Sequence, residues 1–245
     1  MPRFYCPIPL TSGAVLALPP DAARHVQVLR LQPGHAITLF DGTGGEWEAC
    51  VTRMGRSEVV VTVGAHHDVE REAARVVHLL AAITANERMD WLVEKAAELG
   101  AASLTPLLAE RSALKPRGER ADKKLAHWRA VASAACEQCG RNRVPLIHVA
   151  QSLSNWLERE RTNGTPPDAP ARGIRLLLSL QPDALALREV APGTGHVTLL
   201  SGPEGGLTLA EEGAARAAGF VPVSLGPRVL RAETAPLAVL AALTL

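Results

Sequence analysis

The chain has 245 residues and a formal net charge of +1 at pH 7, with 47% hydrophobic and 21% charged residues. This balance excludes a disordered or fibrous protein, and no apolar stretch is long enough to span a bilayer. Because single domains usually have roughly 100 to 200 residues, we expect two domains.

The start of the chain and its cysteines indicate a compartment. Residues 1–7 lack the basic and apolar segments of a secretory leader, so we expect a cytoplasmic protein. Of the four cysteines only Cys136 and Cys139 lie close together, which does not resemble a disulfide framework. We expect no metal either, because tetrahedral zinc needs four ligands and no second pair has the required spacing.

The first 70 residues are predicted to form a small, barrel-like, β-rich domain, residues 1–70. Alternating apolar residues and turn signals predict strands at 14–18, 35–40, 47–53 and 58–63. A helix is predicted from Asp21 to Leu29, with Asp21 as its N-terminal cap. The glycines of 41–45 supply the positive φ angles that tight turns need, so this segment is predicted to form a hairpin turn.

After the charged stretch 68–75, short apolar runs alternate with segments of helical period, which is typical of an α/β sheet. We therefore place a second domain at residues 76–245. Its predicted strands are 76–83, 103–108, 146–148, 174–180, 196–201 and 220–225. Its predicted helices are 87–99, 119–139, 152–161, 208–218 and a terminal helix that has Pro236 in its first turn.

Several of these helix ends have specific signals. Gly100 is expected as a left-handed cap, and Ser152 as an N-terminal cap. Thr208 followed by Glu211 predicts a capping box. Residues 162–173 are rich in proline, glycine and small polar residues, so we predict an exposed loop there.

Basic residues are concentrated in one part of the chain. Between Arg111 and Arg143 there are nine Lys and Arg against three Asp and Glu, a local net charge of +6. Such an excess can hold a nucleic-acid backbone although the whole chain is almost neutral. A solvated helix face would have the same composition, so the sequence leaves both interpretations open.

Two loops are candidates for a ligand site, because each follows a predicted strand and precedes a predicted helix. The first, 200–206, combines three glycines and a proline with a single charge, Glu204. It has neither a P-loop ending nor the dinucleotide-binding spacing, and it could also be an ordinary turn. The second, 224–235, contains Arg228, Arg231 and Glu233 between apolar residues; a purely structural Arg–Glu pair is the alternative there.

These two loops resemble the last third of the RsmE-type 16S ribosomal RNA uridine N3-methyltransferases, members of the SPOUT superfamily. The resemblance extends over nearly the whole chain. Blocks at 87–91, 95–100, 110–112 and 135–145 are similar to family blocks and follow in the family order. The N-terminal domain resembles the family's PUA-like RNA-binding domain, with Arg3, Phe4 and the 25–34 stretch in place.

The resemblance implies a SPOUT domain that is trefoil-knotted, with a mostly parallel sheet and flanking helices, preceded by the PUA-like barrel. It also implies S-adenosylmethionine as the cofactor and a homodimer. The implied reaction is methylation of N3 of a specific uridine in the decoding region of 16S ribosomal RNA, within the small ribosomal subunit.

The same resemblance implies which residues form the site. Arg231 would stabilise charge on a uracil carbonyl, and Glu204 or Glu233 would handle the N3 proton. RNA contacts are expected from Arg3, Arg30, Arg88, Arg111, Arg141 and Arg143. Cofactor contacts are expected from Leu178, Leu200, Gly202, Gly205, Gly206, Leu225, Gly226, Leu230 and Thr234.

Two departures from the family pattern keep alternatives open. Ala85 stands where a family lysine is expected, and Ala232 where a threonine is usual. A non-catalytic RNA-binding or ribosome-assembly factor of the same fold is therefore an alternative. A third is a metabolic α/β enzyme with a nucleotide cofactor, in keeping with the near-neutral charge.

Overall fold

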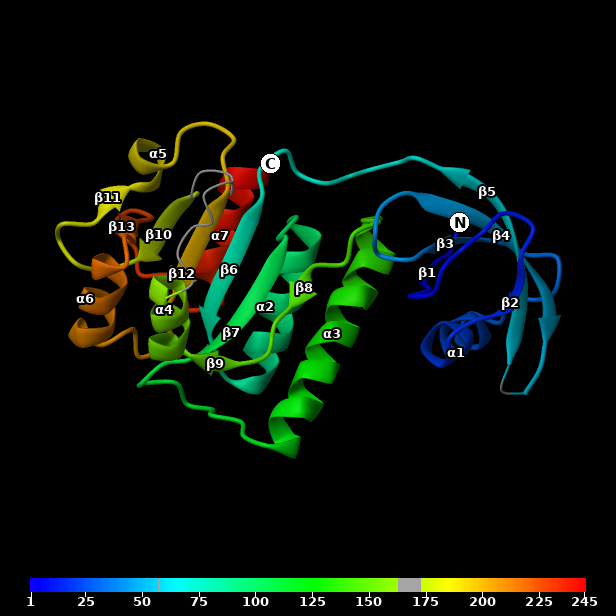
Figure 1. Cartoon of the computed structure of the whole chain (residues 1–245), viewed down its shortest axis with the longest axis horizontal. Helices are drawn as coiled ribbons and strands as arrows, with labels where there is room; N and C mark the ends of the chain where they lie inside the picture. Colours follow the sequence, from blue (N-terminus) through cyan, green and yellow to red (C-terminus); the bar gives the residue numbers. More distant parts are fainter. Residues whose placement is uncertain (57, 163–172) are drawn as a thin grey trace. The chain divides into compact units, whose positions relative to one another are not determined.

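The computed structural model describes residues 1–56, 58–162 and 173–245. Residues 163–172 of the loop predicted at 162–173 therefore lie outside the described part. The chain forms two compact units (Figure 1). The first combines Met1–Glu72 with Ser133–Val144, and the second combines Ala73–Ala132 with Pro145–Leu245. No helix among the described residues is long and apolar enough to cross a membrane.

The first unit is built on a five-stranded sheet in the order β1-β3-β4-β5-β2. Its elements are β1 (Arg3–Tyr5), β2 (Val15–Ala17), α1 (Pro20–Val28), β3 (Ala36–Phe40), β4 (Glu46–Met54) and β5 (Val59–His67). The four predicted strands are confirmed as β2 to β5, and β5 continues further than predicted. The short strand β1, which pairs with β3 in parallel, was not predicted. Its Phe4 is fully buried in the core of this unit.

The predicted cap of α1 is wrong. The capping position is Pro19, no side chain caps the helix, and Asp21 lies within the first turn. Pro20 occupies the first helical position, where its missing N–H is no loss because that donor has no intrahelical partner. Asp21 instead stabilises the helix through the positive end of its dipole.

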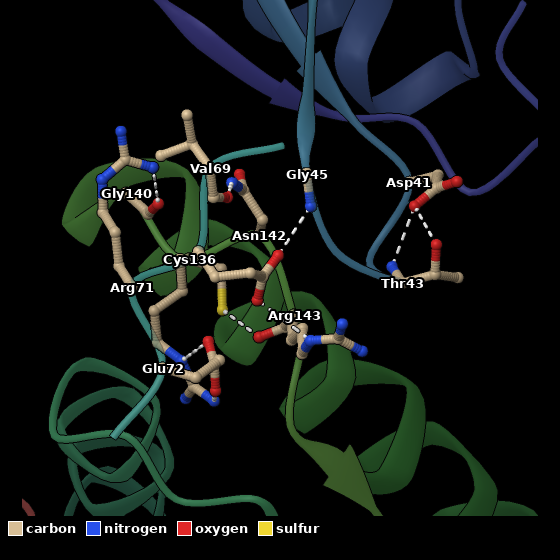
Figure 2. Close-up of polar contacts among 12 residues, drawn as sticks. Asp41, Thr43, Gly45, Val69, Arg71, Glu72, Cys136, Gly140, Asn142 and Arg143 are labelled. Atoms are coloured by element: carbon tan, nitrogen blue, oxygen red, sulfur yellow. Dashed lines mark hydrogen bonds and ion pairs between the residues drawn. The ribbon is translucent and has the colours of Figure 1, made fainter. Parts of the chain in front are cut away.

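The hairpin predicted at 41–45 is confirmed between the antiparallel strands β3 and β4. Asp41 accepts hydrogen bonds from the backbone N of Thr43 (2.8 Å) and from its Oγ1 (2.7 Å), as Figure 2 shows. Gly42, Gly44 and Gly45 have positive φ angles, as expected. The turn is therefore specified locally, by an aspartate side chain and three glycines.

The second unit is an α/β structure on a parallel sheet in the order β11-β13-β10-β12-β6-β7-β8, with β9 also paired to β7. Its strands are β6 (Val77–Ala82), β7 (Ser103–Leu108), β8 (Leu146–Ile147), β9 (Gln151–Ser152), β10 (Ile174–Leu178), β11 (Leu185–Ala186), β12 (Val197–Ser201) and β13 (Val221–Ser224). All six predicted strands are present. The strand predicted at 174–180 ends earlier, at Leu178, and the two-residue strands β9 and β11 were not predicted.

Helices cover both faces of this sheet (Figure 1). The helices of this unit are α2 (Asn86–Glu98), α4 (Leu153–Thr162), α5 (Leu187–Val190), α6 (Leu209–Ala217), α7 (Thr234–Thr244) and, as far as Ala132, α3 (Glu119–Cys139). Buried residues of α4 and α6 share a core with Leu80, Leu177 and Leu200 of the strands. Because side chains alternate along a strand, the neighbouring leucines face the opposite side, where α7 packs on β6 and β12.

The helix-end signals of the second unit are confirmed. Gly100 has a φ of +86° after α2. The Ser152 hydroxyl accepts a hydrogen bond from the Asn155 N (3.1 Å), and Thr208 and Glu211 form the predicted capping box at α6. Pro236 lies in the first turn of α7, which begins at Thr234. These caps fix where the loops before α6 and α7 end.

Candidate active site

A cavity of about 310 Å³ lies at the carboxyl ends of β10, β12 and β13. β10 pairs in parallel with both β12 and β13, so the loops that follow the three strands lie at the same edge of the sheet. That edge is where open α/β sheets bind ligands. The lining side chains come mainly from the segments 178–181, 201–207, 223–226 and 228–230, with Arg111, Glu212, Ala232 and Ala235 added from elsewhere.

The loop after β12 brings its backbone directly to the cavity. The Gly206 N donates to the Pro203 carbonyl oxygen (2.8 Å), which closes a tight turn, and Gly206 has a φ of +69°. A side chain at Gly202 would place its Cβ only 3.0 Å from the Leu207 N. Glycine is therefore required at Gly206 by conformation and at Gly202 by space.

The loop after β13 forms an apolar wall. Leu225, Val229 and Leu230 line the cavity together with Ala232. The Ser224 hydroxyl accepts a hydrogen bond from the Gly226 N (3.2 Å), which fixes the start of this loop. Apolar side chains beside exposed backbone groups suit a ligand that has both an apolar part and hydrogen-bonding edges.

The loop after β10 contributes polar groups that the sequence did not single out. Ser179 is buried, its N donates to the Val223 carbonyl oxygen (3.1 Å), and its hydroxyl donates to Glu212 Oε2 (3.1 Å). Glu212 belongs to the first turn of α6. The only sequence signal for Ser179 and Gln181 is their place directly after a predicted strand.

An arginine lies between two carboxylates at the cavity. Arg88 Nη1 is 3.3 Å from Oε1 of Glu204, and Arg88 Nε is 3.8 Å from Oε1 of Glu233. The Ala85 N also donates to Glu204 Oε1 (3.1 Å). Glu204 lines the cavity, whereas Glu233 is buried and its Oε2 has no hydrogen-bond partner among the described residues. The two glutamates predicted to handle the proton therefore share one arginine that was predicted to contact RNA.

The predicted catalytic arginine lies apart from this cluster. Arg231 is exposed and does not line the cavity, although its neighbours Leu230 and Ala232 do. Its carbonyl oxygen accepts from the Thr234 N (2.9 Å) and the Ala235 N (3.0 Å) at the start of α7. The backbone of Arg231 is thus fixed, while its guanidinium has no partner among the described residues.

Most residues predicted to bind the cofactor do line this cavity: Leu178, Gly202, Gly205, Gly206, Leu225, Gly226 and Leu230. Leu200 does not, because it points into the core between the sheet and α4. Thr234 is not among the lining residues either, and begins α7.

Arg111, predicted to contact RNA, lies at the cavity. Its Nη1 donates to the Gly205 carbonyl oxygen (3.0 Å), and its side chain packs against Gly205, where a Cβ would be 3.3 Å from Arg111 Cβ. Arg111 therefore braces the glycine loop. Nothing in the sequence pattern links residues so far apart.

Four other predicted RNA contacts belong to the first unit. Arg30 is exposed, with a φ of +54°. Arg3 forms an ion pair with Glu46 and donates to Asn142 Oδ1 (2.6 Å). Arg141 is buried and donates to both carboxylate oxygens of Glu72. Arg3 and Arg141 are therefore each ion-paired with a glutamate of the same unit.

Arg143 is the more exposed member of the 140–143 segment. Half of its side chain (54%) is exposed, and its Nε donates to Glu70 Oε2 (3.0 Å). Figure 2 shows how the segment is fixed: Asn142 donates to the Val69 carbonyl oxygen, and Arg71 Nη1 donates to that of Gly140 (2.9 Å). The segment therefore presents Arg143 to solvent from a rigid backbone.

The cysteine pair lies at the end of α3, where Cys136 is buried. A hydrogen bond with Cys139 and burial raise the pKa of the Cys136 thiol, which also donates to the Arg143 carbonyl oxygen (3.7 Å; Figure 2). The described residues contain no group of three or more His, Cys, Asp or Glu side chains placed to hold a metal.

Family models match two parts of the chain, and the longer match includes residues 133–144, which the structure groups with the first unit. A family model described as an RNA methyltransferase domain matches residues 71–244, and one described as an RNA methyltransferase PUA domain matches residues 18–64. The fold is thus a PUA-like domain followed by a SPOUT-type domain, and its class is that of the RNA methyltransferases.

Individual relatives narrow the class. The crystal structure of ribosomal RNA small subunit methyltransferase E from Neisseria gonorrhoeae, bound to S-adenosylmethionine, is 36% identical, covers 99% of this chain and 96% of that chain, and has a TM-score of 0.90. A Legionella pneumophila protein solved with the same cofactor is 36% identical over 98% of this chain and 96% of its own, with a TM-score of 0.89. The Bacillus subtilis ribosomal RNA small subunit methyltransferase E is 30% identical and covers 89% of this chain and 85% of its own length. The chain belongs to the ribosomal RNA small subunit methyltransferase E family.

Proposed function

We propose that this chain transfers a methyl group from S-adenosylmethionine to N3 of one uridine in the decoding region of 16S ribosomal RNA, within the small ribosomal subunit. The observation that carries the proposal is the cavity at the ends of β10, β12 and β13, with the Glu204, Arg88 and Glu233 cluster beside it. A ribosomal substrate also implies that the enzyme acts in the cytoplasm.

The cavity fits S-adenosylmethionine by its chemistry. Backbone groups of 202–206 can meet the hydrogen-bonding edge of an adenine, and Leu178, Leu225 and Leu230 can surround an apolar chain. Glu204 and Glu212 supply negative charge near a sulfonium. When bound, this cofactor supplies an electrophilic methyl group. The loops would hold it so that the uracil nitrogen approaches in line, and positioning of this kind accounts for much of such a rate enhancement.

The N3 proton of uracil must leave during the reaction. We assign this proton to Glu204 or Glu233, which are the carboxylates grouped around Arg88. Glu233 is buried, and one of its oxygens has no hydrogen-bond partner among the described residues, which is a costly arrangement unless a ligand completes it. Arg231, exposed next to the cavity-lining residues, would stabilise the negative charge that develops on a uracil carbonyl.

RNA binding is assigned to both units. Residues 1–70 would act as the PUA-like RNA-binding domain and residues 76–245 as the catalytic SPOUT domain. The exposed Arg30 and Arg143 would contact phosphates directly. Arg3 and Arg141 are ion-paired within their unit, so their contribution would be to hold the 140–143 segment in place.

We also propose that the SPOUT domain is trefoil-knotted and dimeric. Support for a knot comes from the end of the chain: after β13 at one side of the sheet, α7 returns to pack on β6 and β12. A homodimer would let one subunit complete the substrate site of the other, as the exposed position of Arg231 invites.

The test is methyl transfer from tritiated S-adenosylmethionine to small ribosomal subunits that lack the modification, followed by nucleoside analysis. Label in 3-methyluridine is expected. Label in a different nucleoside would contradict the N3 assignment. RNA binding without cofactor binding would favour the non-catalytic RNA-binding factor, for which the Ala85 and Ala232 departures are the argument.

A further inference from the structure

A second cavity, of about 200 Å³, lies in the same unit as the candidate active site and has no role in the proposed chemistry. It is lined by Ile83 and Thr84 of the β6–α2 connection, by Met89 of α2 and by residues of the segment 113–128. Its charged lining residues are Lys115, Arg120 and Lys124. We call it the basic cavity, because its only charged lining residues are cations.

The floor and the rim of the basic cavity differ in chemistry. Ile83, Met89 and Trp128 are at most 2% exposed and provide an apolar floor. Arg120, Lys124 and Trp128 follow one another at intervals of four residues, so they share one face of α3. Lys115, from the loop before α3, adds a third cation.

These three cations have no acidic partner among the described residues. Among the described residues, Lys115 donates only to the Glu110 carbonyl oxygen (2.8 Å), and Arg120 and Lys124 form no ion pair. By contrast, Lys123 on the same helix pairs with Glu119 at 2.7 Å. Three cations at the rim of one cavity, with no carboxylate of the described residues to neutralise them, attract an anionic group.

A buried hydroxyl in the lining also lacks a partner. Thr84 is 1% exposed, and its Oγ1 has no hydrogen-bond partner among the described residues. Buried polar groups are rarely left unsatisfied, so the hydroxyl is an independent indication of a ligand. An apolar floor, a free hydroxyl and a cationic rim together match a planar base that carries a phosphate.

The basic cavity lies next to the candidate active site along the chain. Thr84 lines it, while the following residue, Ala85, donates its N–H to Glu204 of the first cavity. Arg88, one turn further along α2, binds the same carboxylate. The two cavities are therefore separated by the short segment 84–88.

We propose that the basic cavity binds a phosphate-bearing nucleotide of the RNA substrate, next to the nucleotide that is methylated. That the nucleotide belongs to the RNA substrate rests on the proposed function. That the cavity binds an anionic group rests on its lining residues alone. The cationic rim would hold the phosphate, the Thr84 hydroxyl would bond to the base or sugar, and the apolar floor would contact the base.

The test uses the full chain saturated with S-adenosylmethionine, with uridine 5′-monophosphate and uridine as probes. The indole N–H signal of Trp128 in a ¹H–¹⁵N spectrum is the local probe, because Trp128 lines this cavity and its Nε1 donates to Asp90 Oδ1 (3.0 Å). Uridine 5′-monophosphate should shift it and should bind at least about fivefold more tightly than uridine, because phosphate contacts dominate such affinities. No shift of that signal, or equal affinity for the two probes, would overturn the proposal.

A matched pair of variants separates the cavity from general surface charge. Lys124→Ala should weaken binding of the monophosphate by about three- to tenfold and raise the KM for small subunits, with cofactor affinity unchanged. Lys123→Ala removes the same charge from the preceding residue, which does not line the cavity, and should leave the monophosphate affinity and the KM within about twofold. Equal effects of the two variants would contradict a defined site.

Thr84→Val should change the affinity for uridine 5′-monophosphate and the thermal stability in different directions. It removes a buried, unsatisfied hydroxyl at constant shape, so thermal stability should stay the same or rise. Affinity for the monophosphate should fall, and an unchanged affinity would remove the hydroxyl from the proposed site. The two proposals also fail separately: methyl transfer without monophosphate binding refutes this cavity alone, whereas monophosphate binding without methyl transfer refutes only the proposed reaction.

Discussion

The Nε atom of Arg88 lies 3.8 Å from Oε1 of the buried Glu233, and its Nη1 atom lies 3.3 Å from Oε1 of Glu204. One guanidinium therefore balances the charge of a carboxylate before α7 and of another after β12. A group that contacts two carboxylates at once is a positioning residue for both: without it Glu233 loses its cation, and Glu204 keeps only the hydrogen bond from the Ala85 N.

Arg88→Met should lower methyl transfer by about tenfold or more, because both carboxylates lose their common partner. The free energy of unfolding should fall by about 1–3 kcal/mol, since Arg88 is 40% exposed but the Glu233 side chain, only 9% exposed, loses its cation. Glu233→Gln combined with Arg88→Met should recover that stability without recovering activity. Denaturation in urea of the two single variants and the double variant measures the coupling. Additive losses would show that Arg88 does not stabilise Glu233.

Glu204→Ala and Arg231→Ala should each lower turnover far more than stability. We expect losses of about 100-fold in turnover, typical of a proton-transfer or charge-stabilising group, with changes in unfolding free energy of about 1 kcal/mol or less. Single-turnover methyl transfer and thermal unfolding of the same samples provide the comparison. Arg216→Ala, which removes a cation that pairs with Asp183 on the surface, is the control. Unchanged turnover in both variants would mean that the catalytic assignment is wrong.

Two glycine substitutions close in sequence should act in opposite directions. Gly206→Ala meets no atom within 4 Å but forces a side chain into a φ of +69°, so we expect a loss of about 1–2 kcal/mol and weaker cofactor binding. Gly213→Ala also meets no atom within 4 Å, and lies inside α6, so it should stabilise by about 0.5–1 kcal/mol. Thermal unfolding and cofactor calorimetry check both. Equal shifts of the two variants would rule out conformation as the reason for Gly206.

Stability should depend on pH through Glu46. Burial alone would raise the pKa of Glu46, but hydrogen bonds from Arg71 and Arg3 outweigh it and lower the pKa from 4.5 to about 2. Because the folded-state pKa is below the unfolded one, this stabilisation is complete above pH 4.5 and is lost as the pH falls toward 2. Glu46→Gln should cost about 1–3 kcal/mol at pH 7 and flatten the acid limb.

The control for Glu46 is Glu58→Gln, which removes a half-exposed carboxylate paired with Arg53 in the same unit. Urea denaturation at several pH values between 7 and 2.5 measures both. If the two variants follow the same acid limb, Glu46 does not carry the pH dependence.

The sequence was most informative where structure is set locally. Helix α3 begins and ends at the predicted residues, Glu119 and Cys139, and the Thr208 capping box formed as expected. Both depend on residues within a few positions of one another. The strand β1 was missed because three residues carry no period, and it is held by parallel pairing with β3, more than thirty residues away.

The sequence predicted which loops line the candidate site, but it did not predict the side-chain contacts within the site. The glycine loop and the 225–230 segment line the cavity because they follow parallel strands, which a sequence pattern can indicate. The bracing of Gly205 by Arg111 and the contact of Arg88 with Glu204 join residues about a hundred positions apart. Only the packed sheet brings these together, so no spacing in the chain could indicate them.

The first unit also contains a later segment of the chain, Ser133–Val144. In this segment Glu137 accepts a hydrogen bond from the Tyr5 N (2.8 Å), and Asn142 accepts one from Arg3. A chimera that exchanged only residues 1–72 with a relative would pair one protein's β-sheet with the other's Glu137 and Asn142. The exchangeable module is therefore discontinuous, and recombination or domain grafting in this family should succeed only when the 133–144 segment travels with the N-terminal residues.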